Sequence, residues 1–363
     1  MSKKKTIYIH IGSPKTGTSS IQSFLTINNK TLIKKGIFYP LIGRKNANSS
    51  IINGSTIIEN NKNKSFKKSL KEFNKNKCSS ILFSDEVLFL PETNFCDKIE
   101  VNSISKYNVK IIVYLRNSCE YLCGLWQEEI RNNSIFKLED FIRQYPYIES
   151  LKLLYNLSEK FGKRNIIVRP YNKNLNVIAD FFSIFNINID GGFCFPEKRI
   201  NSGISRNLAE KFLYLNKYLN IKLEENPFNV WKIIKQDKNN ISIIDSLPKK
   251  TRRSISEKYN EIECKIAKDF LNKDKLFCNK DPVILDKKRS IYKKLTKTDK
   301  EELKFIINLI INKQNLAIQH QNNDLIKKIL TKKQKRISKL LISILCTLIP
   351  LKKYRKKIRS YIS

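Results

Sequence analysis

The stretch that most constrains the fold is residues 6–25, near the start of the chain. Residues 6–11 (Thr-Ile-Tyr-Ile-His-Ile) are rich in β-branched and aromatic side chains, which predicts a buried strand. Two glycines, Gly12 and Gly17, follow within six residues and predict a tight loop. The chain therefore enters a strand and then turns sharply.

A helix is expected directly after this loop. Ile21, Phe24 and Leu25 recur at helical spacing and give it one apolar face, and Thr18 or Ser19 can cap its first turn. A strand, a glycine loop and a helix N-terminus in this order predict a phosphate site. Backbone N–H groups point into such a loop, and the helix dipole adds partial positive charge.

The position of the lysine narrows the range of ligands that the loop could bind. A nucleoside-triphosphate loop has lysine directly after its second glycine, whereas here residue 18 is Thr and the lysine is Lys15, inside the loop. Ser19 and Ser20 keep hydroxyls at the start of the helix. A lysine two residues before the second glycine suits the bridging oxygen of a 5′-phosphosulfate better than the far end of a triphosphate. An ordinary strand–turn–helix with a surface lysine is the plainer alternative.

This segment closely resembles the 5′-phosphosulfate loop of sulfotransferases that use PAPS (3′-phosphoadenosine 5′-phosphosulfate). The run from His10 through Gly12, Lys15 and Gly17 to Ser20 is similar to their bacterial, polysaccharide-type members. The resemblance covers about residues 6–280. It implies a P-loop-like three-layer α/β sandwich with a central parallel sheet, and PAPS as co-substrate with PAP (3′,5′-bisphosphate) as product.

Further core strands are predicted at residues 79–83, 110–115 and 165–168, with a short strand at 36–40. Residues 84–86 (Ser-Asp-Glu) follow the second core strand, and reacting groups in open α/β sheets lie beyond the carboxyl ends of strands. Glu86 is therefore a candidate general base, a role that the resemblance also implies. The alternative is that Ser84 caps a helix and that the carboxylates of Asp85 and Glu86 interact favourably with the positive end of its dipole. For Asp85 that alternative is preferred.

Arg116 ends the most hydrophobic predicted strand and precedes a helix expected over 118–131. The resemblance implies that this arginine makes a bidentate contact with the 3′-phosphate through its planar guanidinium group. The family has a serine eight residues later, where this chain has Gly124, so one hydroxyl contact is missing. The nucleotide-binding set that the resemblance implies comprises Gly12, Ser13, Pro14, Lys15, Thr16, Gly17, Thr18, Ser19, Ser20, Arg116 and Gly124, and the implied catalytic residues are Lys15 and Glu86.

The remaining segments give weaker signals. Residues 190–206 predict a loop whose Arg199, Asn201 and Arg206 are candidate ligand contacts, and residues 43–77 predict a loop and a lysine-rich helix. His10 and His320, the only two histidines, are not obvious bases. The eight cysteines contain no C-x-x-C pair, so a zinc site is not expected. No other metal is expected either, because the leaving group of the implied reaction carries less charge than a triphosphate does.

Charge and the C-terminal tail bear on partners. The net charge is +37, of which residues 291–363 carry +15, so anionic partners are expected. We predict a sulfotransferase-like domain over 1–285 and a basic helical tail over 286–363. Residues 340–351 are mostly apolar but too short to span a bilayer. The tail therefore fits either an anionic membrane surface or a helical hairpin packed on the domain.

The sequence thus predicts a cytoplasmic enzyme, without a signal peptide, that transfers a sulfuryl group from PAPS to a hydroxyl or amine of a cell-surface glycan. The first of the two alternatives for the tail would hold the enzyme on the inner face of the membrane. Three alternatives stay open: a P-loop kinase or NTPase, a PAP-binding relative without catalysis, and a basic nucleic-acid binder. The last has no recognition motif in its favour, and no nucleic-acid partner is expected.

Overall fold

The computed structural model describes residues 4–45, 50–58, 64–99, 104–132, 134–189, 191–196, 204–219, 242–277 and, with gaps, 295–308. The chain divides into two compact units, residues 1–294 and 295–363. The predicted boundary between 285 and 286 lies outside the described residues, as does the apolar run 340–351.

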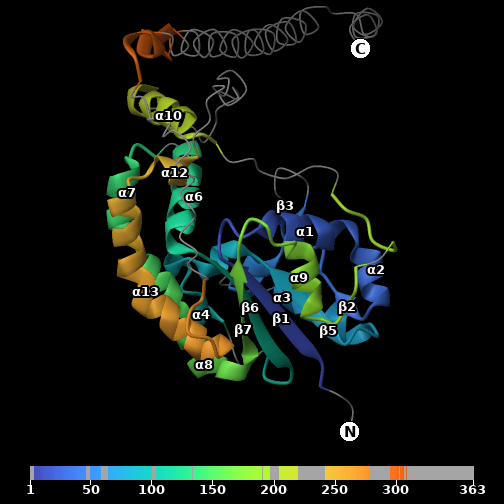
Figure 1. Ribbon diagram of the computed structural model, residues 1–363. Helices are drawn as coiled ribbons and strands as arrows, with labels where there is room; N and C mark the ends of the chain where they lie inside the picture. Colours follow the sequence, from blue (N-terminus) through green and yellow to red (C-terminus); the bar gives the residue numbers. More distant parts are fainter. Residues whose placement is uncertain are drawn as a thin grey trace, which may run out of the picture. The chain divides into compact units, whose positions relative to one another are not determined.

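A five-stranded sheet forms the centre of the first unit (Figure 1). Its order is β2-β5-β1-β6-β7, and every neighbouring pair is parallel. The strands are β1 (Thr6–Gly12), β2 (Ile37–Phe38), β5 (Ser80–Ser84), β6 (Asn108–Arg116) and β7 (Ile166–Tyr171). Since β1 lies between β5 and β6, the carboxyl ends of these three strands meet at one edge, where the order of the chain reverses.

The central strands are buried on both faces, which explains their continuous apolar sequence. In β6, the residues from Ile111 to Leu115 have no exposed surface. Ile9 of β1 lies opposite Phe83 on one side and Ile111 on the other. The predicted positions of the core strands are confirmed to within a few residues.

Helices α1 (Thr18–Ile27) and α9 (Val177–Ser183) cover one face of the sheet. Phe24 of α1 and Phe182 of α9 pack against each other with ring centroids 5.1 Å apart. Both belong to a buried cluster that includes Leu82, Ile112 and Tyr114 from the strands.

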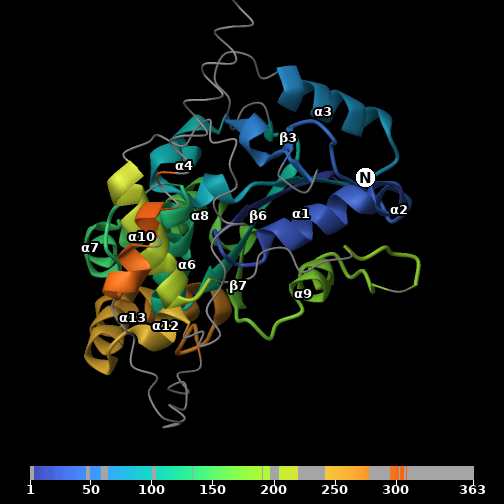
Figure 2. The same ribbon diagram turned by 90° about the horizontal axis from the view of Figure 1, so that it is seen from above.

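Helix α3 (Lys64–Lys75) covers the opposite face, where Phe66 packs on Phe83 with ring centroids 5.3 Å apart. Figure 2 shows α1 and α9 together on one side and α3 on the other. Helices on both faces of a parallel sheet confirm the predicted P-loop-like three-layer α/β sandwich. The lysine-rich helix expected within 43–77 is α3; the small antiparallel pair β3 (Arg44–Lys45) and β4 (Ile51–Ile52) was not predicted.

Helix α6 (Ser118–Arg131) follows β6 directly, as predicted, and its Trp126 is fully buried. Asn117 caps it by accepting hydrogen bonds from the N–H groups of Cys119 and Glu120. Further helices of this unit are α2 (Asn29–Lys34), α4 (Phe95–Lys98), α7 (Leu138–Gln144), α8 (Tyr147–Phe161), α10 (Arg206–Leu219), α12 (Ile243–Ser246) and α13 (Lys249–Leu271).

The second unit is described only over residues 295–308, and those described from 297 onward are helical. Most of the basic helical tail predicted over 286–363 lies outside the described part. No helix within the described residues is long and apolar enough to cross a membrane.

Candidate functional site

The loop between β1 and α1 has an unusual backbone. Gly12, Lys15 and Gly17 all have left-handed φ angles of 81°, 65° and 81°, a conformation that costs little for glycine and is strained for lysine. The loop is fastened to β6, because Ser13 donates from its N–H and from its Oγ to the carbonyl oxygen of Tyr114, at 2.9 and 3.0 Å.

This backbone leaves a row of donors without partners. Within the described part of the chain, the N–H groups of five consecutive residues, Lys15 to Ser19, make no hydrogen bond. They surround the N-terminus of α1, where the helix dipole adds partial positive charge. Successive inward N–H groups at left-handed positions form a concavity that binds anions.

The helix cap differs from the expectation. Neither Thr18 nor Ser19 caps α1: the N-cap is Gly17, and no side chain bonds to the first turn. A side-chain cap would have occupied one of the loop's donors. The prediction of a Thr18 or Ser19 cap was wrong because the left-handed Gly17 ends the loop one residue earlier.

The predicted loop residues have different surroundings. The hydroxyls of Ser13 and Thr16 are bonded within the protein, Thr16 Oγ1 donating to the Ser13 carbonyl at 2.5 Å. Pro14 and Thr18 are buried, whereas Ser19 and Ser20 are only half-buried. Ser19 and Ser20 are thus the accessible hydroxyls at the start of the helix.

Lys15 lies against helix α6. A Cβ atom at Gly124 would lie 3.3 Å from Lys15 Cγ and 3.8 Å from Arg116 Nη1, so the lysine stem and the arginine both approach α6 at its glycine. One turn further along α6, Glu128 Oε2 lies 3.0 Å from Lys15 Nζ. The structure therefore brings Lys15, Arg116 and Gly124 of the predicted set together.

Arg116, at the end of β6, connects the loop to α6 and β7. Its Nη1 donates to the Lys15 carbonyl at 3.1 Å, and its Nε donates to Glu120 Oε2 at 2.9 Å. The guanidinium lies 5.6 Å from the ring centroid of Tyr171, a cation–π contact. Because Nε and Nη1 are bonded within the protein, Nη2 is the group of Arg116 with no described partner.

Glu86 lies on the other side of the loop. A Cβ atom at Gly12 would lie 2.7 Å from Glu86 Cβ, so only a glycine admits this approach. Gln22 of α1 donates to Glu86 Oε2 at 2.8 Å. Burial raises the pKa of Glu86 above its usual value, the Asp85 charge adds to this rise, and the Gln22 hydrogen bond partly offsets it. A carboxylate with a raised pKa is suited to accept a proton near neutral pH.

Asp85 has a structural role. It is fully buried, its Oδ1 accepts from Arg44 at 2.7 Å, and both oxygens accept backbone N–H groups, from Val87 and Ser55. Asp85 also caps the short helical turn that begins at Glu86. The alternative of a Ser84 cap was wrong because the Ser84 hydroxyl bonds to His10 Nδ1 instead, at 2.8 Å.

His10 belongs to the core. Its ring is fully buried between the rings of Tyr114 and Phe181, at centroid distances of 5.9 and 5.2 Å. Burial lowers the pKa of His10 to about 3, so the imidazole is neutral at physiological pH.

Of the three ligand contacts predicted in the loop 190–206, the structure describes one. Arg199 and Asn201 lie outside the described residues. Arg206 is buried, pairs with Glu210 at 2.7 Å and lies 5.0 Å from a ring centroid of Trp126. It fastens α10 to α6.

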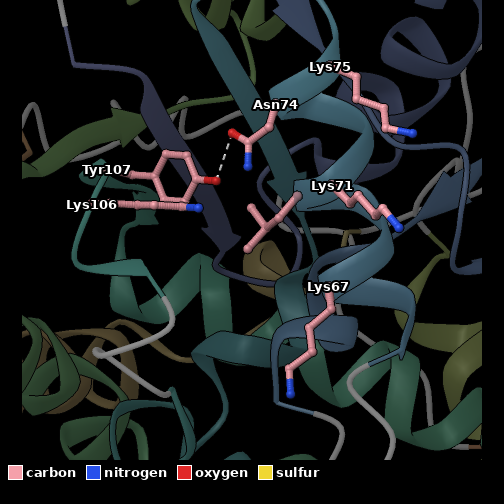
Figure 3. Close-up of a pocket in the computed structure, with 7 residues that line it drawn as sticks. Lys67, Lys71, Asn74, Lys75, Lys106 and Tyr107 are labelled. Carbon is pink, nitrogen blue, oxygen red and sulfur yellow. Dashed lines mark hydrogen bonds between the residues drawn. The ribbon is translucent and has the colours of Figure 1, made fainter.

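A shallow depression elsewhere on the domain is not part of this site. Lysines from α3 and Lys106 surround it, and Tyr107 donates a hydrogen bond to Asn74 Oδ1 at 2.9 Å (Figure 3). It lies near the amino end of β6, whereas the loop with Lys15 follows the carboxyl end of β1. The described residues contain no group of three or more His, Cys, Asp or Glu side chains placed to hold a metal.

Two side chains of the site were not predicted. Gln22 holds Glu86, and Glu128 holds Lys15. A signal for Gln22 exists in the sequence, since it is a polar residue next to the apolar positions of α1. Glu128 is one of two adjacent acids on a helix surface, and nothing in the sequence links it to Lys15.

Comparison with known proteins gives weak similarities. No known protein family and no curated protein matches the chain. A sulfotransferase crystal structure from Alicyclobacillus acidocaldarius is similar, with 13% identity, 57% of this chain and 89% of that chain covered, and a TM-score of 0.33. Mouse sulfotransferase SULT7A1 complexed with PAP has 12% identity, 71% and 84% coverage and a TM-score of 0.34. Similarities of this size do not place the chain in a family.

Proposed function

We propose that the protein is a sulfotransferase that moves a sulfuryl group from PAPS to a hydroxyl of a glycan. The observation that carries this proposal is the loop itself. Five consecutive N–H groups without described partners surround the start of α1, with Lys15 inside the loop and Glu86 against Gly12. An anion cradle, a cation and a partly buried carboxylate therefore lie at the neighbouring carboxyl ends of β1 and β5.

The residues present fit PAPS. The N–H groups of residues 15–19 and the Lys15 amine would hold the 5′-phosphosulfate, with the half-buried hydroxyls of Ser19 and Ser20 beside them. Arg116, through the Nη2 group that has no described partner, would meet the 3′-phosphate. Gly124, where the family has a serine, has no hydroxyl and lies against the Lys15 stem, which leaves that contact to Arg116 and backbone groups.

PAPS supplies an activated sulfuryl group, whose bond to the 5′-phosphate oxygen breaks as the acceptor oxygen bonds to sulfur. Glu86 takes the proton from the acceptor hydroxyl, and its raised pKa makes it a better base than an ordinary glutamate. Lys15 and the loop N–H groups stabilise the negative charge that develops on the departing phosphate oxygen. Such donors, fixed in advance, stabilise the transition state more than the ground state.

A P-loop kinase or NTPase is the second candidate, because the loop has the same glycine spacing. Two observations favour sulfuryl transfer over it. Residue 18 is Thr rather than the lysine of a triphosphate loop. Asp85, at the end of β5, is bonded to Arg44, Ser55 and Val87, so its oxygens are committed to the fold rather than to a magnesium ion.

A transfer assay tests the proposal. Purified protein is incubated with PAPS labelled in its sulfate and with mixed bacterial surface polysaccharides as acceptors. We expect label in the polysaccharide fraction and PAP in the supernatant. Binding of PAP without any transfer would support the non-catalytic relative, and transfer from labelled ATP would support the kinase.

The glycan acceptor and the membrane role of the tail are further parts of the proposal. The resemblance to polysaccharide-type sulfotransferases supports a glycan acceptor. The charge of +15 on residues 291–363 supports binding of the tail to an anionic membrane. Truncation at about residue 290 should release the protein from anionic liposomes. Unchanged binding would reject a membrane role for the tail.

A further inference from the structure

The ion pair between Lys15 and Glu128 joins the most important cation of the candidate site to a residue outside the predicted set. Lys15 Nζ and Glu128 Oε2 are 3.0 Å apart, and the two side chains are 20% and 45% exposed. No ligand is needed to hold the amine: a carboxylate already does so.

The geometry of α6 explains why this partner is Glu128. Gly124 and Glu128 are four residues apart and so lie on the same face of the helix. The lysine stem passes Gly124, where the missing side chain leaves room, and the amine then reaches the next turn. The left-handed backbone of Lys15, which Arg116 holds through its carbonyl, directs the stem toward α6.

We propose that Glu128 is a positioning residue that competes with the nucleotide for the Lys15 amine. In the resting site the amine is paired with Glu128. When an anionic 5′-phosphate enters the loop, the amine exchanges the carboxylate for the phosphate, and it returns to Glu128 when product leaves. Glu128 thereby weakens the binding of PAP and promotes its release.

The surroundings of Glu128 allow this exchange. Burial lowers the pKa of Arg131, and the Glu128 carboxylate partly offsets that effect, so Glu128 keeps a cationic neighbour when Lys15 leaves. Glu128 is also nearly half exposed, which lets water solvate the released carboxylate. A pair that is this exposed is weak enough to break on ligand binding.

The adjacent acid provides a matched control. Glu129 is the next carboxyl group along α6. Burial raises its pKa, and the charges of Glu128 and Glu92 add to the rise, so it lies close enough to Glu128 to interact with it. It has no ion pair among the described residues. A variant at Glu129 removes a neighbouring carboxyl group but leaves the Lys15 pair in place.

Calorimetric titration with PAP at about 0.15 M salt, where exposed charges are screened beyond roughly 8 Å, tests the exchange. We expect Glu128→Gln to bind PAP about two- to fivefold more tightly than the unchanged protein, the range that an exposed ion pair is worth. Glu129→Gln should have a clearly smaller effect, and Glu128→Asp should restore affinity toward that of the unchanged protein. A merely structural defect would weaken binding instead.

A double variant separates exchange from simple repulsion. In the Lys15→Met background the tightening by Glu128→Gln should shrink, because there is no amine to compete for. Equal tightening with and without Lys15, or an equal effect of Glu129→Gln, would overturn the proposal. So would unchanged or weaker PAP binding by Glu128→Gln.

The proposal uses the proposed function only in the choice of PAP as probe. Inorganic pyrophosphate is therefore titrated in parallel. If PAP does not bind but Glu128→Gln tightens pyrophosphate binding, the sulfotransferase function fails and the exchange stands. If PAP binds and Glu128→Gln affects neither probe, the exchange fails and the function stands.

Discussion

Gly12 and Glu86 approach so closely that a Cβ atom on Gly12 would lie 2.7 Å from Glu86 Cβ and 2.9 Å from Glu86 Cα. The end of β5 therefore rests directly on the loop that follows β1. This contact places the proposed base beside the proposed phosphate cradle, and it requires a glycine for two reasons, the space and the φ angle of 81°.

We expect Gly12→Ala to cost about 3 kcal/mol of unfolding free energy, from the left-handed backbone and the collision together. Gly36→Ala is the matched control. Gly36 also has a left-handed φ angle, of 84°, but the atom nearest to an added Cβ would be the Ser79 hydroxyl oxygen at 3.3 Å. The backbone cost of about 1 kcal/mol therefore remains without the collision. Equal losses in denaturant titrations of the two variants would contradict the close packing of Glu86.

Glu86→Gln should abolish transfer and leave PAP affinity intact, because the amide cannot accept the acceptor's proton. A loss of about 10²–10⁴-fold in kcat is expected for a general base. Because the pKa of Glu86 is raised, kcat of the unchanged protein should fall as the pH is lowered through a value above about 4.3. Full activity in Glu86→Gln, measured by the labelled-PAPS assay, would remove Glu86 from the mechanism.

Lys15→Ala should reduce turnover far more than PAP binding. Loss of a donor that stabilises developing charge costs about 10²–10³-fold in kcat, whereas the five loop N–H groups still hold the phosphate. Lys15→Met, which keeps most of the stem but not the charge, is the control for side-chain bulk. If turnover and affinity fall by the same factor, Lys15 is only a ligand contact.

Gly124→Ser tests the missing hydroxyl. The added Cβ would lie 3.3 Å from Lys15 Cγ, and the flexible lysine stem can shift by the few tenths of an ångström required. We expect tighter PAP binding than in Gly124→Ala, which adds the Cβ without the hydroxyl. Identical affinities of the two variants in calorimetry would show that the serine position has no phosphate contact here.

Glu263 makes folding stability depend on pH. It is partly buried against the start of α6, where it accepts the N–H of Ser118 at 3.2 Å, and burial raises its pKa to about 7. The raised value favours the protonated form in the folded state. The stabilisation that Glu263 contributes to the folded state is therefore fully present below about pH 4.3, the pKa of a glutamate in the unfolded chain. It is lost as the pH rises through 7.

We accordingly expect Glu263→Gln to stabilise the protein at pH 8 by at most about 3 kcal/mol and to have little effect near pH 4. The glutamine oxygen can still accept the Ser118 N–H. Thermal denaturation of both proteins across this pH range is the measurement, and a pH-independent difference would contradict it.

The core strands and the phosphate loop could be predicted from the sequence because their signals are local. Runs rich in β-branched, aromatic and other apolar residues mark β1, β5 and β6, and the spacing of Gly12, Lys15 and Gly17 marks the loop. The start of α13 could not be predicted, because its first turns at 249–254 contain no apolar residue and the helix is held by packing further along. The capping of α1 was predicted wrongly, because a left-handed Gly17 replaces a side-chain cap.

The contacts within the site depend on distant pairs. Gln22 and Glu86 are 64 residues apart, and Lys15 and Arg116 are 101 apart. Such pairs leave no periodicity in the sequence. Asp85 and Glu86 are adjacent and chemically alike, yet their surroundings differ. Asp85 is buried and pairs with Arg44, whereas Glu86 packs against Gly12 of the loop.

The central claim is that the Lys15 loop holds the 5′-phosphate of a PAPS-derived nucleotide. Calorimetric titration of the full chain with PAP, and separately with ATP and magnesium, tests it most directly. We expect a saturable heat with PAP that falls in Arg116→Ala, and little or none with ATP and magnesium. A strong signal from ATP and magnesium with no heat from PAP would contradict it.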